Sequence, residues 1–347
     1  MKFRISNIGM PDGWLKGLAV VLAFVVTASV AGPGPARAEM DPSKVVGPNK
    51  CAECHKKETQ VWQATHHFTT FKNLPRSKEA RKIANKMGIR RIKNESLCLN
   101  CHFTTQKEAN GKVEAIAGIS CESCHSPAKD WMKRHSEFSG KKKGQETPAE
   151  VAARWADSEK AGMIRPKNMY RLAKNCYSCH VVPQEKLVNT GGHPAGSKFE
   201  LVAWSQGEIR HNIWYSPDGK NMEASQERKR LMYVVGMAVE LETALRAVGK
   251  ATERQIYAVA MARRAAAARK SMDAIAKALS GVPEVAAIAK DGHEAGLKLN
   301  NDAELSAAAD KIATQTKALV AKYDGSTFGA VDSMLPPESA YKGKPAL

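Results

Sequence analysis

All eight cysteines of the chain belong to four copies of one pattern, in which two residues separate a pair of cysteines and a histidine follows the pair. The copies contain Cys51, Cys54 and His55; Cys98, Cys101 and His102; Cys121, Cys124 and His125; and Cys176, Cys179 and His180. Two thiols at this spacing can form thioether bonds to the two vinyl groups of one heme, and the adjacent histidine can then bind its iron. The pattern predicts four covalently attached hemes c, with these cysteines as attachment points and these histidines as proximal ligands.

Three other uses of paired cysteines fit this pattern less well. Tetrathiolate zinc sites would leave the histidine after every pair without a role. A disulfide framework predicts varied spacings in a short, loop-rich chain. A thioredoxin-like redox motif would occur once, beside a βαβ pattern that this chain lacks. Covalent heme is therefore the prediction.

Six further histidines compete for the four axial iron positions that the motifs leave open. They are His66, His67, His135, His193, His211 and His293. Neighbors in a chain point to different sides, so we expect only one of His66 and His67, namely His67, to face a heme. We expect His135, His193 and His211 to be the other distal ligands. His293 lies in a segment without cysteines and is predicted to be a solvated residue.

The first 38 residues have the features of a secretory signal peptide. Basic residues precede an apolar stretch over residues 18–30, and a small-residue cleavage site ends at Ala38. The apolar stretch is too short for a comfortable bilayer span. We therefore expect a periplasmic protein that keeps no stable membrane span after cleavage.

Basic residues outnumber acidic ones, with 53 Lys and Arg against 35 Asp and Glu, and the formal net charge is +18. An exported protein meets neither chromosomal DNA nor the anionic cytoplasmic leaflet, so we exclude nucleic acid as a partner. The charge instead predicts acidic redox proteins as partners. Lys50, Lys56 and Lys57 flank the first motif, and our hypothesis is that they steer such a partner to it.

A composition shift divides the chain near residue 220, at the turn signal of residues 217–219. Residues 39–220 contain every cysteine and nine of the ten histidines. Their helical patterns are short, such as residues 78–87 and a segment that a capping box at Thr147 and Glu150 opens. There is little β pattern. Low secondary-structure content is expected where hemes, rather than side chains, fill the core.

Residues 221–330 consist of long alanine-rich helical patterns. Apolar residues recur at three and four positions over residues 225–248, and Thr252 with Gln255 opens a second pattern, to about residue 279. Further helices are predicted over residues 283–297 and 301–323. Short connections favor an antiparallel bundle, followed by an extended tail over residues 331–347. The predicted fold class is mainly α, with a multiheme cytochrome c module and a C-terminal helical bundle.

Residues 49–180 resemble the tetraheme cytochrome c-554 family, whose members accept electrons from hydroxylamine oxidoreductase. The resemblance rests on Trp62, Thr65 and His67 after the first motif, and on the residues around the third motif, from Gly118 to His135. It implies a mostly helical fold with hemes in closely stacked pairs.

The resemblance also implies a set of distal ligands. The position of His135 serves the first heme in this family and that of His67 the third, while the second heme is five-coordinate. The fourth heme takes a downstream histidine, for which His193 and His211 are both candidates here. The spare histidine could close the second heme.

Three functions follow from these observations. The leading prediction is a periplasmic tetraheme cytochrome that relays electrons between a redox enzyme or quinol dehydrogenase and an acceptor, because an iron with two imidazoles has no vacant position for a substrate. The alternative is a heme enzyme that reduces a small nitrogen-oxide-type ligand at a five-coordinate second heme. In a third hypothesis the helical bundle is an adaptor or the interface of an oligomer.

Overall fold

The computed structural model describes residues 40–346. The signal peptide expected over residues 1–38 lies outside the described residues. The described part belongs to one structural unit, and none of its helices is long and apolar enough to cross a membrane.

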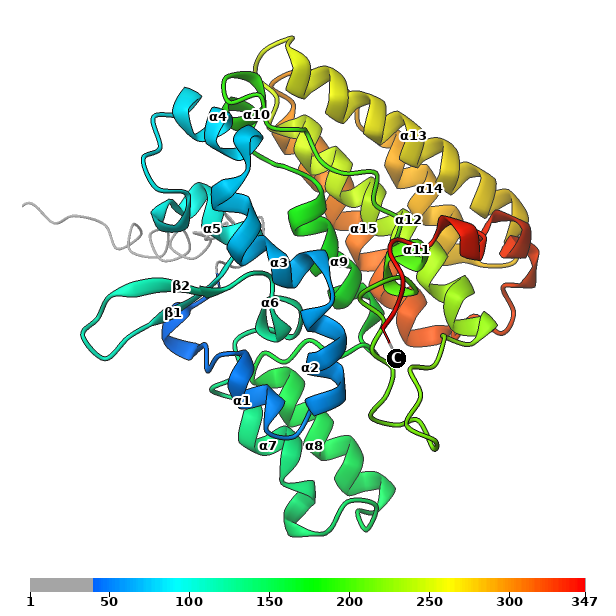
Figure 1. Cartoon of the computed structure of the whole chain (residues 1–347). Coiled ribbons are helices and arrows are strands. Elements are labelled where there is room, and N and C mark those ends of the chain that lie inside the picture. The colour runs from blue at the N-terminus through cyan, green and yellow to red at the C-terminus, as the bar shows by residue number, and fades with distance from the viewer. Residues whose placement is uncertain (1–39, 347) are drawn as a thin grey trace, which may run out of the picture. The chain divides into compact units, whose positions relative to one another are not determined.

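Short helices and one hairpin form the first half of this unit (Figure 1). Their bounds are α1 Pro48–Ala52, α2 Lys56–Gln63, α3 His66–Asn73, α4 Lys78–Lys86, α5 Ser96–His102, β1 Thr104–Lys107, β2 Val113–Ala117, α6 Cys121–His125, α7 Met132–Ser136, α8 Pro148–Lys160, α9 Met169–His180, α10 Glu185–Asn189 and α11 Leu201–Ser205. The prediction of a mainly α fold is confirmed.

Two helix boundaries in this half lie where the sequence places them. Helix α8 follows a capping box in which the Thr147 and Glu150 side chains each accept a hydrogen bond from the other residue's backbone N–H. Helix α4 begins after Ser77, whose hydroxyl accepts from the Ala80 N–H, and it ends before Gly88 at φ +71°. Both termini are therefore determined locally.

The β1–β2 hairpin is a feature that the sequence analysis missed. The two antiparallel strands are joined through Asn110 and Gly111, and Gly111 has φ +85°. The Asn-Gly pair is a strong hairpin signal, and it could have indicated this turn. The Thr104 hydroxyl donates to the carbonyl of Gly118, next to the third cysteine motif, so the hairpin helps to place that motif.

Four long helices form the C-terminal bundle, α12 Gln226–Gly249, α13 Ile256–Ala278, α14 Pro283–Glu294 and α15 Asp302–Lys322. The apolar face predicted on α12 is buried throughout. The expected start of α13 at Thr252 is wrong by about one turn. The Thr252 hydroxyl donates instead to Glu185 of α10, so it does not cap the helix, which begins after Gln255.

One apolar core extends from α9 through the bundle, because α9 and α11 pack against α12. Residues 40–168 contribute few buried apolar side chains, namely Val45, Val61, Ala84, Ile92, Phe103, Ala117, Ala128 and Trp131. The helix that carries the fourth motif is thus anchored in the bundle, whereas the other three motifs lie outside this core. The domain boundary near residue 220 stays a prediction.

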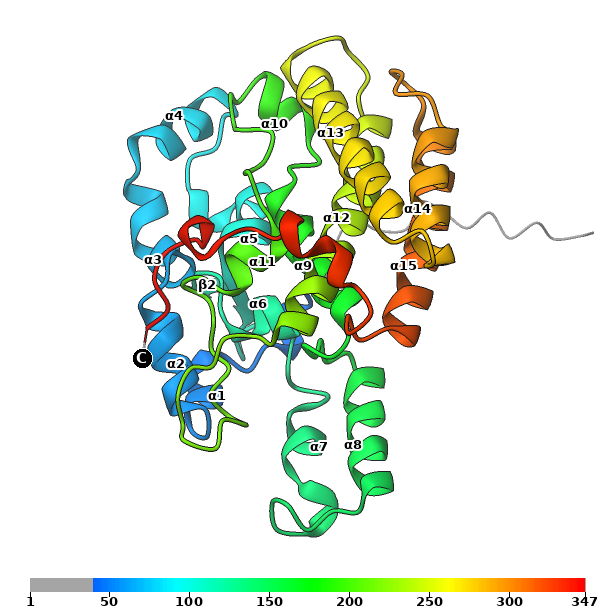
Figure 2. The same ribbon diagram turned by 90° about the vertical axis from the view of Figure 1, so that its right-hand side faces the viewer.

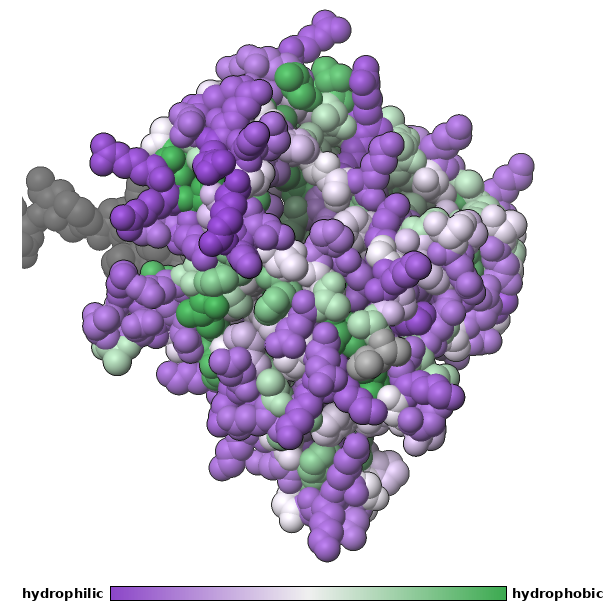
Figure 3. All heavy atoms as spheres, viewed as in Figure 1, coloured by the Kyte–Doolittle hydropathy of each residue, from purple (hydrophilic) through white to green (hydrophobic). Residues whose placement is uncertain are grey.

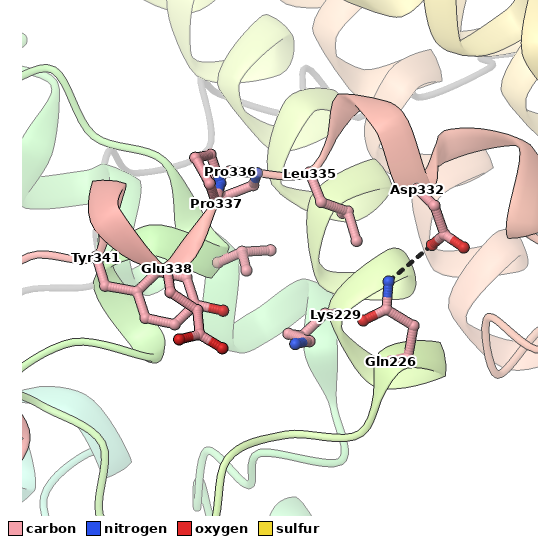
Figure 4. A pocket seen from close by; sticks show the side chains of 9 residues that line it. Gln226, Lys229, Asp332, Leu335, Pro336, Pro337, Glu338 and Tyr341 are labelled. Atoms are coloured by element: carbon pink, nitrogen blue, oxygen red, sulfur yellow. Dashed lines mark hydrogen bonds between the residues drawn. The ribbon is translucent and has the colours of Figure 1, made fainter.

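The last residues fold back across α11 (Figure 2). They contain two short 3-10 helices, Gly329–Met334 and Glu338–Ala340, joined by extended residues. The Lys342 N–H donates to the carbonyl of Ala203 at 2.9 Å. Together with the start of α12, this tail lines a shallow pocket, at whose edge the Gln226 amide donates to Asp332 (Figure 4).

The packing of α12 gives a stability prediction. Leu241 is fully buried, and its side chain lies against Gly292 of α14. We expect Leu241→Ala to lower the free energy of unfolding by about 2–5 kcal/mol, because it leaves a cavity in a close-packed interior. Leu299→Ala is the control, since Leu299 is 38% exposed. Equal losses for both variants in urea unfolding would contradict the packing described.

Candidate heme-binding sites

Each motif histidine faces a second histidine from a distant part of the chain. The ring centers are 6.4 Å apart for His55 and His135, 6.2 Å for His102 and His193, 6.2 Å for His125 and His211, and 6.3 Å for His180 and His67. The angles between the ring planes vary from 20° to 87°, so ring stacking does not explain this common distance.

The common distance is that of two imidazoles on opposite sides of one metal ion. A metal lies about 2 Å from each ligating nitrogen, and the ring center lies about 1 Å beyond, which separates the two centers by about 6 Å. An iron in a porphyrin can bind two such ligands, because the porphyrin supplies four nitrogens and leaves two positions open. The residues of all four sites therefore fit a heme with an imidazole on each face.

Hydrogen bonds orient five of these eight rings. The Nδ1 atoms lie 2.9 Å from the carbonyl of Ile164 for His125, 2.7 Å from the Ser197 hydroxyl for His180, 2.8 Å from the carbonyl of Pro194 for His193, 2.5 Å from that of Met132 for His135 and 2.6 Å from that of Ile209 for His211. A carbonyl can only accept, so Nδ1 carries the proton in four of these rings and Nε2 keeps its lone pair. Metal-bound histidines usually donate their other ring N–H in this way.

Burial keeps most of these imidazoles neutral. Loss of hydration lowers the pKa of His102, His125 and His180 to about 4. Burial also lowers the pKa of His55, His67 and His135. Neutral imidazole is the form that binds a metal, so these groups need lose no proton to do so near pH 7.

Short helices present the motifs. Motif cysteines lie on or at the end of α1, α5, α6 and α9, where residues three positions apart share one face. The first cysteine of each motif forms no disulfide bond, and therefore the two cysteines of a motif are not bonded to each other; these first cysteines are Cys51, Cys98, Cys121 and Cys176. Both thiols of a pair can therefore be presented to the same porphyrin edge.

Two of the candidate distal histidines lie on helices and two lie in loops. His67 lies on α3 and His135 on α7, whereas His193 and His211 lie in loops. The loop of His193 packs tightly, because a Cβ at Gly191 would lie 2.5 Å from the carbonyl oxygen of Leu187. Only glycine fits at that position.

A buried carboxylate joins the first and third motifs. Glu122, between Cys121 and Cys124, is 1% exposed and accepts hydrogen bonds from the N–H groups of Val46, Gly47 and Ala128 at 2.8–2.9 Å. Val46 and Gly47 lead directly into α1. Because a carboxylate accepts several N–H bonds at once, this one side chain holds the start of the first motif against the third.

Further contacts join the third motif to the fourth and the fourth to the second. The Asn175 amide of α9 donates to the carbonyls of Ser123 and Cys124. Helix α3 carries His67 toward the fourth motif and also packs on the helix of the second, where the Phe71 and Phe103 rings are 6.3 Å apart. The Thr104 hydroxyl, two residues after His102, also lies 2.9 Å from the Ser123 hydroxyl of the third motif. The four motifs are thus joined to one another, with the third motif in contact with segments of the other three.

Two buried indole N–H groups have no hydrogen-bond acceptor within the described residues. The Trp131 ring lies 5.2 Å from that of His135, and the Trp204 ring lies 4.8 Å from that of His180. A buried donor without an acceptor is costly. A heme brings two propionate carboxylates, which can accept from such donors, so these two atoms also fit a bound porphyrin.

The pairing differs from the one that the resemblance implied. His135 lies opposite the first motif as implied, but His67 lies opposite His180 of the fourth motif rather than His125 of the third. His211 takes the place opposite the third motif, and neither His211 nor His193 faces the fourth. A downstream histidine is unnecessary there because α3 brings His67 to α9.

The two histidines left out of the predicted set lie away from the motif histidines. The His66 side chain is 91% exposed, and its Nδ1 lies 2.7 Å from Glu208. His293 pairs with Asp273 on the bundle surface at 3.1 Å. Of the neighbors His66 and His67, only His67 thus lies opposite a motif histidine.

Residues 50–126 match the family model for cytochrome c554 and c-prime. Over this segment the chain is similar to cytochromes of this family. Comparisons with curated proteins and with solved structures found no match. A c-type cytochrome carries covalently bound heme c and transports electrons. The matched segment holds the first three motifs and His67, but not the fourth motif, His135, His193 or His211.

The buried carboxylate gives a second prediction. We expect Glu122→Gln to lower the free energy of unfolding of this cytochrome by about 1–3 kcal/mol, because an amide has one acceptor oxygen where the carboxylate has two. Thermal or urea unfolding measures the change.

Glu53→Gln is the matched control for Glu122→Gln. Glu53 also lies between the cysteines of a motif, but its side chain is 59% exposed and forms only a surface ion pair with Lys50. Such pairs contribute about 0–1 kcal/mol, so the control should be nearly neutral. A neutral Glu122→Gln variant would show that the carboxylate does not hold the two motifs together.

Proposed function

We propose that the chain is a periplasmic tetraheme cytochrome c that relays electrons between a redox enzyme or quinol dehydrogenase and an acceptor. The observation that carries this proposal is the common separation of 6.2–6.4 Å between each motif histidine and a second histidine. Heme c supplies reversible one-electron chemistry of its iron when bound.

The chain's own residues attach, orient and enclose the groups that carry the electrons. The cysteine pairs would attach each heme covalently, and the histidine pairs would bind its iron. An iron with imidazole on both faces changes little in geometry between its two oxidation states and offers no position to a substrate. The contacts that join the four motifs support a relay, since they hold the sites close to one another.

The enzyme alternative requires an open position at the second site. His193 lies opposite His102 at 6.2 Å, and its Nδ1–H is held by the carbonyl of Pro194, so its Nε2 is available to an iron. This arrangement favors the relay over reduction of a nitrogen-oxide-type ligand at that site.

The family match and the net charge support a periplasmic location and acidic redox proteins as partners. C-type cytochromes are commonly periplasmic or extracellular, which agrees with the signal peptide expected from the sequence. The net charge of +18 supports acidic redox proteins as partners. Helices α12–α15 share a core with α9, so a partner bound to the bundle would lie on a body rigidly joined to the fourth motif.

The heme count is the first test of this function. We expect the intact mass of the purified protein to exceed its polypeptide mass by that of four hemes, which stay attached on denaturation because thioether bonds hold them. A double variant, Cys98→Ser with Cys101→Ser, should retain three. A denatured wild-type chain of polypeptide mass alone would refute the proposal.

The axial ligands are tested by electron paramagnetic resonance of the ferric protein. We expect only low-spin signals in the wild type and no binding of carbon monoxide after reduction, because every iron has two imidazoles. His193→Ala and His211→Ala should each convert one low-spin center to high spin, and the converted centers should differ.

His66→Ala and His293→Ala are the controls, because both residues lie away from the motif histidines. Both variants should keep the wild-type spectrum. A high-spin component in the wild type, together with carbon monoxide binding, would instead favor the heme enzyme.

A further inference from the structure

A band of cations covers the outer side of α4 and the turns that flank it. We call it the α4 face and define it by seven exposed residues, Arg76, Lys78, Arg81, Lys82, Lys86, Arg90 and Arg91. Glu79 is the one acidic residue between positions 76 and 93. In Figure 3 this region, at the upper left where α4 lies in Figure 1, is strongly hydrophilic.

Carboxylates of the described residues leave these seven cations unpaired, whereas several cations of other helices form ion pairs. None of the seven has a salt-bridge partner among residues 40–346. On other helices Arg154 pairs with Glu146, Arg264 with Glu240 and Lys311 with Glu294. The charge on the α4 face is therefore not neutralized from within.

Such a face does not help α4 to fold. Lys78, Lys82 and Lys86 follow one another at intervals of four residues, where like charges destabilize a helix. The helix is held by its opposite side, on which Ala84 is buried and Ile83 and Met87 pack against the cores. The cations lie on the other side of the helix and form no ion pair with a carboxylate of the described residues there.

The α4 face lies beside the second heme-binding site. A Cβ on Gly192, next to His193, would lie 3.3 Å from Lys86 Nζ, and one on Gly191 would lie 3.2 Å from the Met87 side chain. At the other end, Ile92–Asn94 leads from Arg91 into α5, which carries Cys98 and His102. Both histidines of the second site are thus on segments that contact or continue α4.

We propose that the α4 face is the docking surface for an acidic electron-transfer protein, which it brings to the second site. This inference rests on the proposed electron-carrier function. Charge complementarity selects the partner, because seven unpaired cations attract an acidic surface and accelerate encounter with it.

The first motif is the rival docking position, and its cations are largely engaged. Lys50 pairs with Glu53 at 2.9 Å, and Lys57 donates to the carbonyl of Gly219 at 3.2 Å. Of the three lysines that the sequence placed there, only Lys56 has neither contact. The attraction is therefore stronger at α4.

A protein partner fits the α4 face better than a membrane surface. Helices that lie on membranes insert large apolar side chains among the lipids. The exposed large apolar residues of the described chain are Phe68, Val113, Tyr215, Met222, Ile256, Val259 and Leu299, and none lies between positions 76 and 93. The face offers charge alone.

The test compares two triple variants of the heme-loaded protein that lose the same charge. Lys78→Gln, Lys82→Gln and Lys86→Gln neutralize part of the α4 face and relieve its repulsion, so α4 keeps its fold. Arg263→Gln, Lys270→Gln and Lys277→Gln neutralize exposed residues of α13. The probe is oxidized flavodoxin, an acidic electron-transfer protein, and its Kd is measured at low ionic strength.

We expect the α4 triple to weaken flavodoxin binding at least about fivefold and to flatten its salt dependence, because close cations dominate the attraction. The α13 triple should change the Kd less than about twofold, since exposed charges beyond a Debye length are screened. Equal weakening by both triples, or by neither, would overturn the docking surface.

Two further measurements complete the test. The first distinguishes a membrane from a protein as the partner, and the second distinguishes a failure of docking from a failure of the electron-carrier function. Sedimentation with phosphatidylglycerol vesicles that depends on the α4 lysines, with an unchanged flavodoxin Kd, would overturn the protein partner in favor of a membrane. Heme content and reduction by the small neutral flavin lumiflavin report the electron-carrier function separately. A chain without heme would overturn that function and the docking inference that rests on it, whereas normal heme with equal weakening overturns the docking surface alone.

Discussion

The fold of the first half depends on one constraint, which it meets at four places. Two imidazole rings are held with their centers 6.2–6.4 Å apart, the distance of two histidines that bind one metal ion. Every pair joins a motif to a distant part of the chain, from His67 with His180 to His102 with His193. Neutral imidazoles in buried surroundings are stable only if their nitrogens find partners. Hydrogen bonds to Nδ1 satisfy one nitrogen in five of the eight rings and leave Nε2 without a partner among the described residues, so these pairs are suited to a ligand between them.

This constraint explains the uneven distribution of the apolar core. The bundle of α12–α15 has a continuous core of close-packed side chains, and α9 is built into it. The segments around the first three motifs have few buried apolar residues and are joined instead by polar contacts such as those of Glu122 and Asn175. Porphyrins would supply the missing apolar surface there. The bundle would then serve as the rigid support of the fourth site.

Most element boundaries were predictable where local rules decide them. The caps at Ser77, Thr147 and Ser225 act within one turn of their own helices. The start of α13 was predicted incorrectly because Thr252 binds Glu185, a residue on another helix. The β1–β2 hairpin was missed because its strands are short, and the Asn110-Gly111 turn is the only sequence signal that indicates it.

The sequence by itself predicts the chemistry of the sites, since two thiols and a histidine at fixed spacing leave little choice of cofactor, and it supplies a set of candidate distal histidines. Only the tertiary structure decided which distal histidine faces which motif. That choice depends on how α3, α7 and two loops pack across the chain, and spacing along a sequence does not measure distance in space. The same reason separates Lys50 and Lys57 beside the first motif, which find partners, from the lysines of α4, which have no ion pair among the described residues.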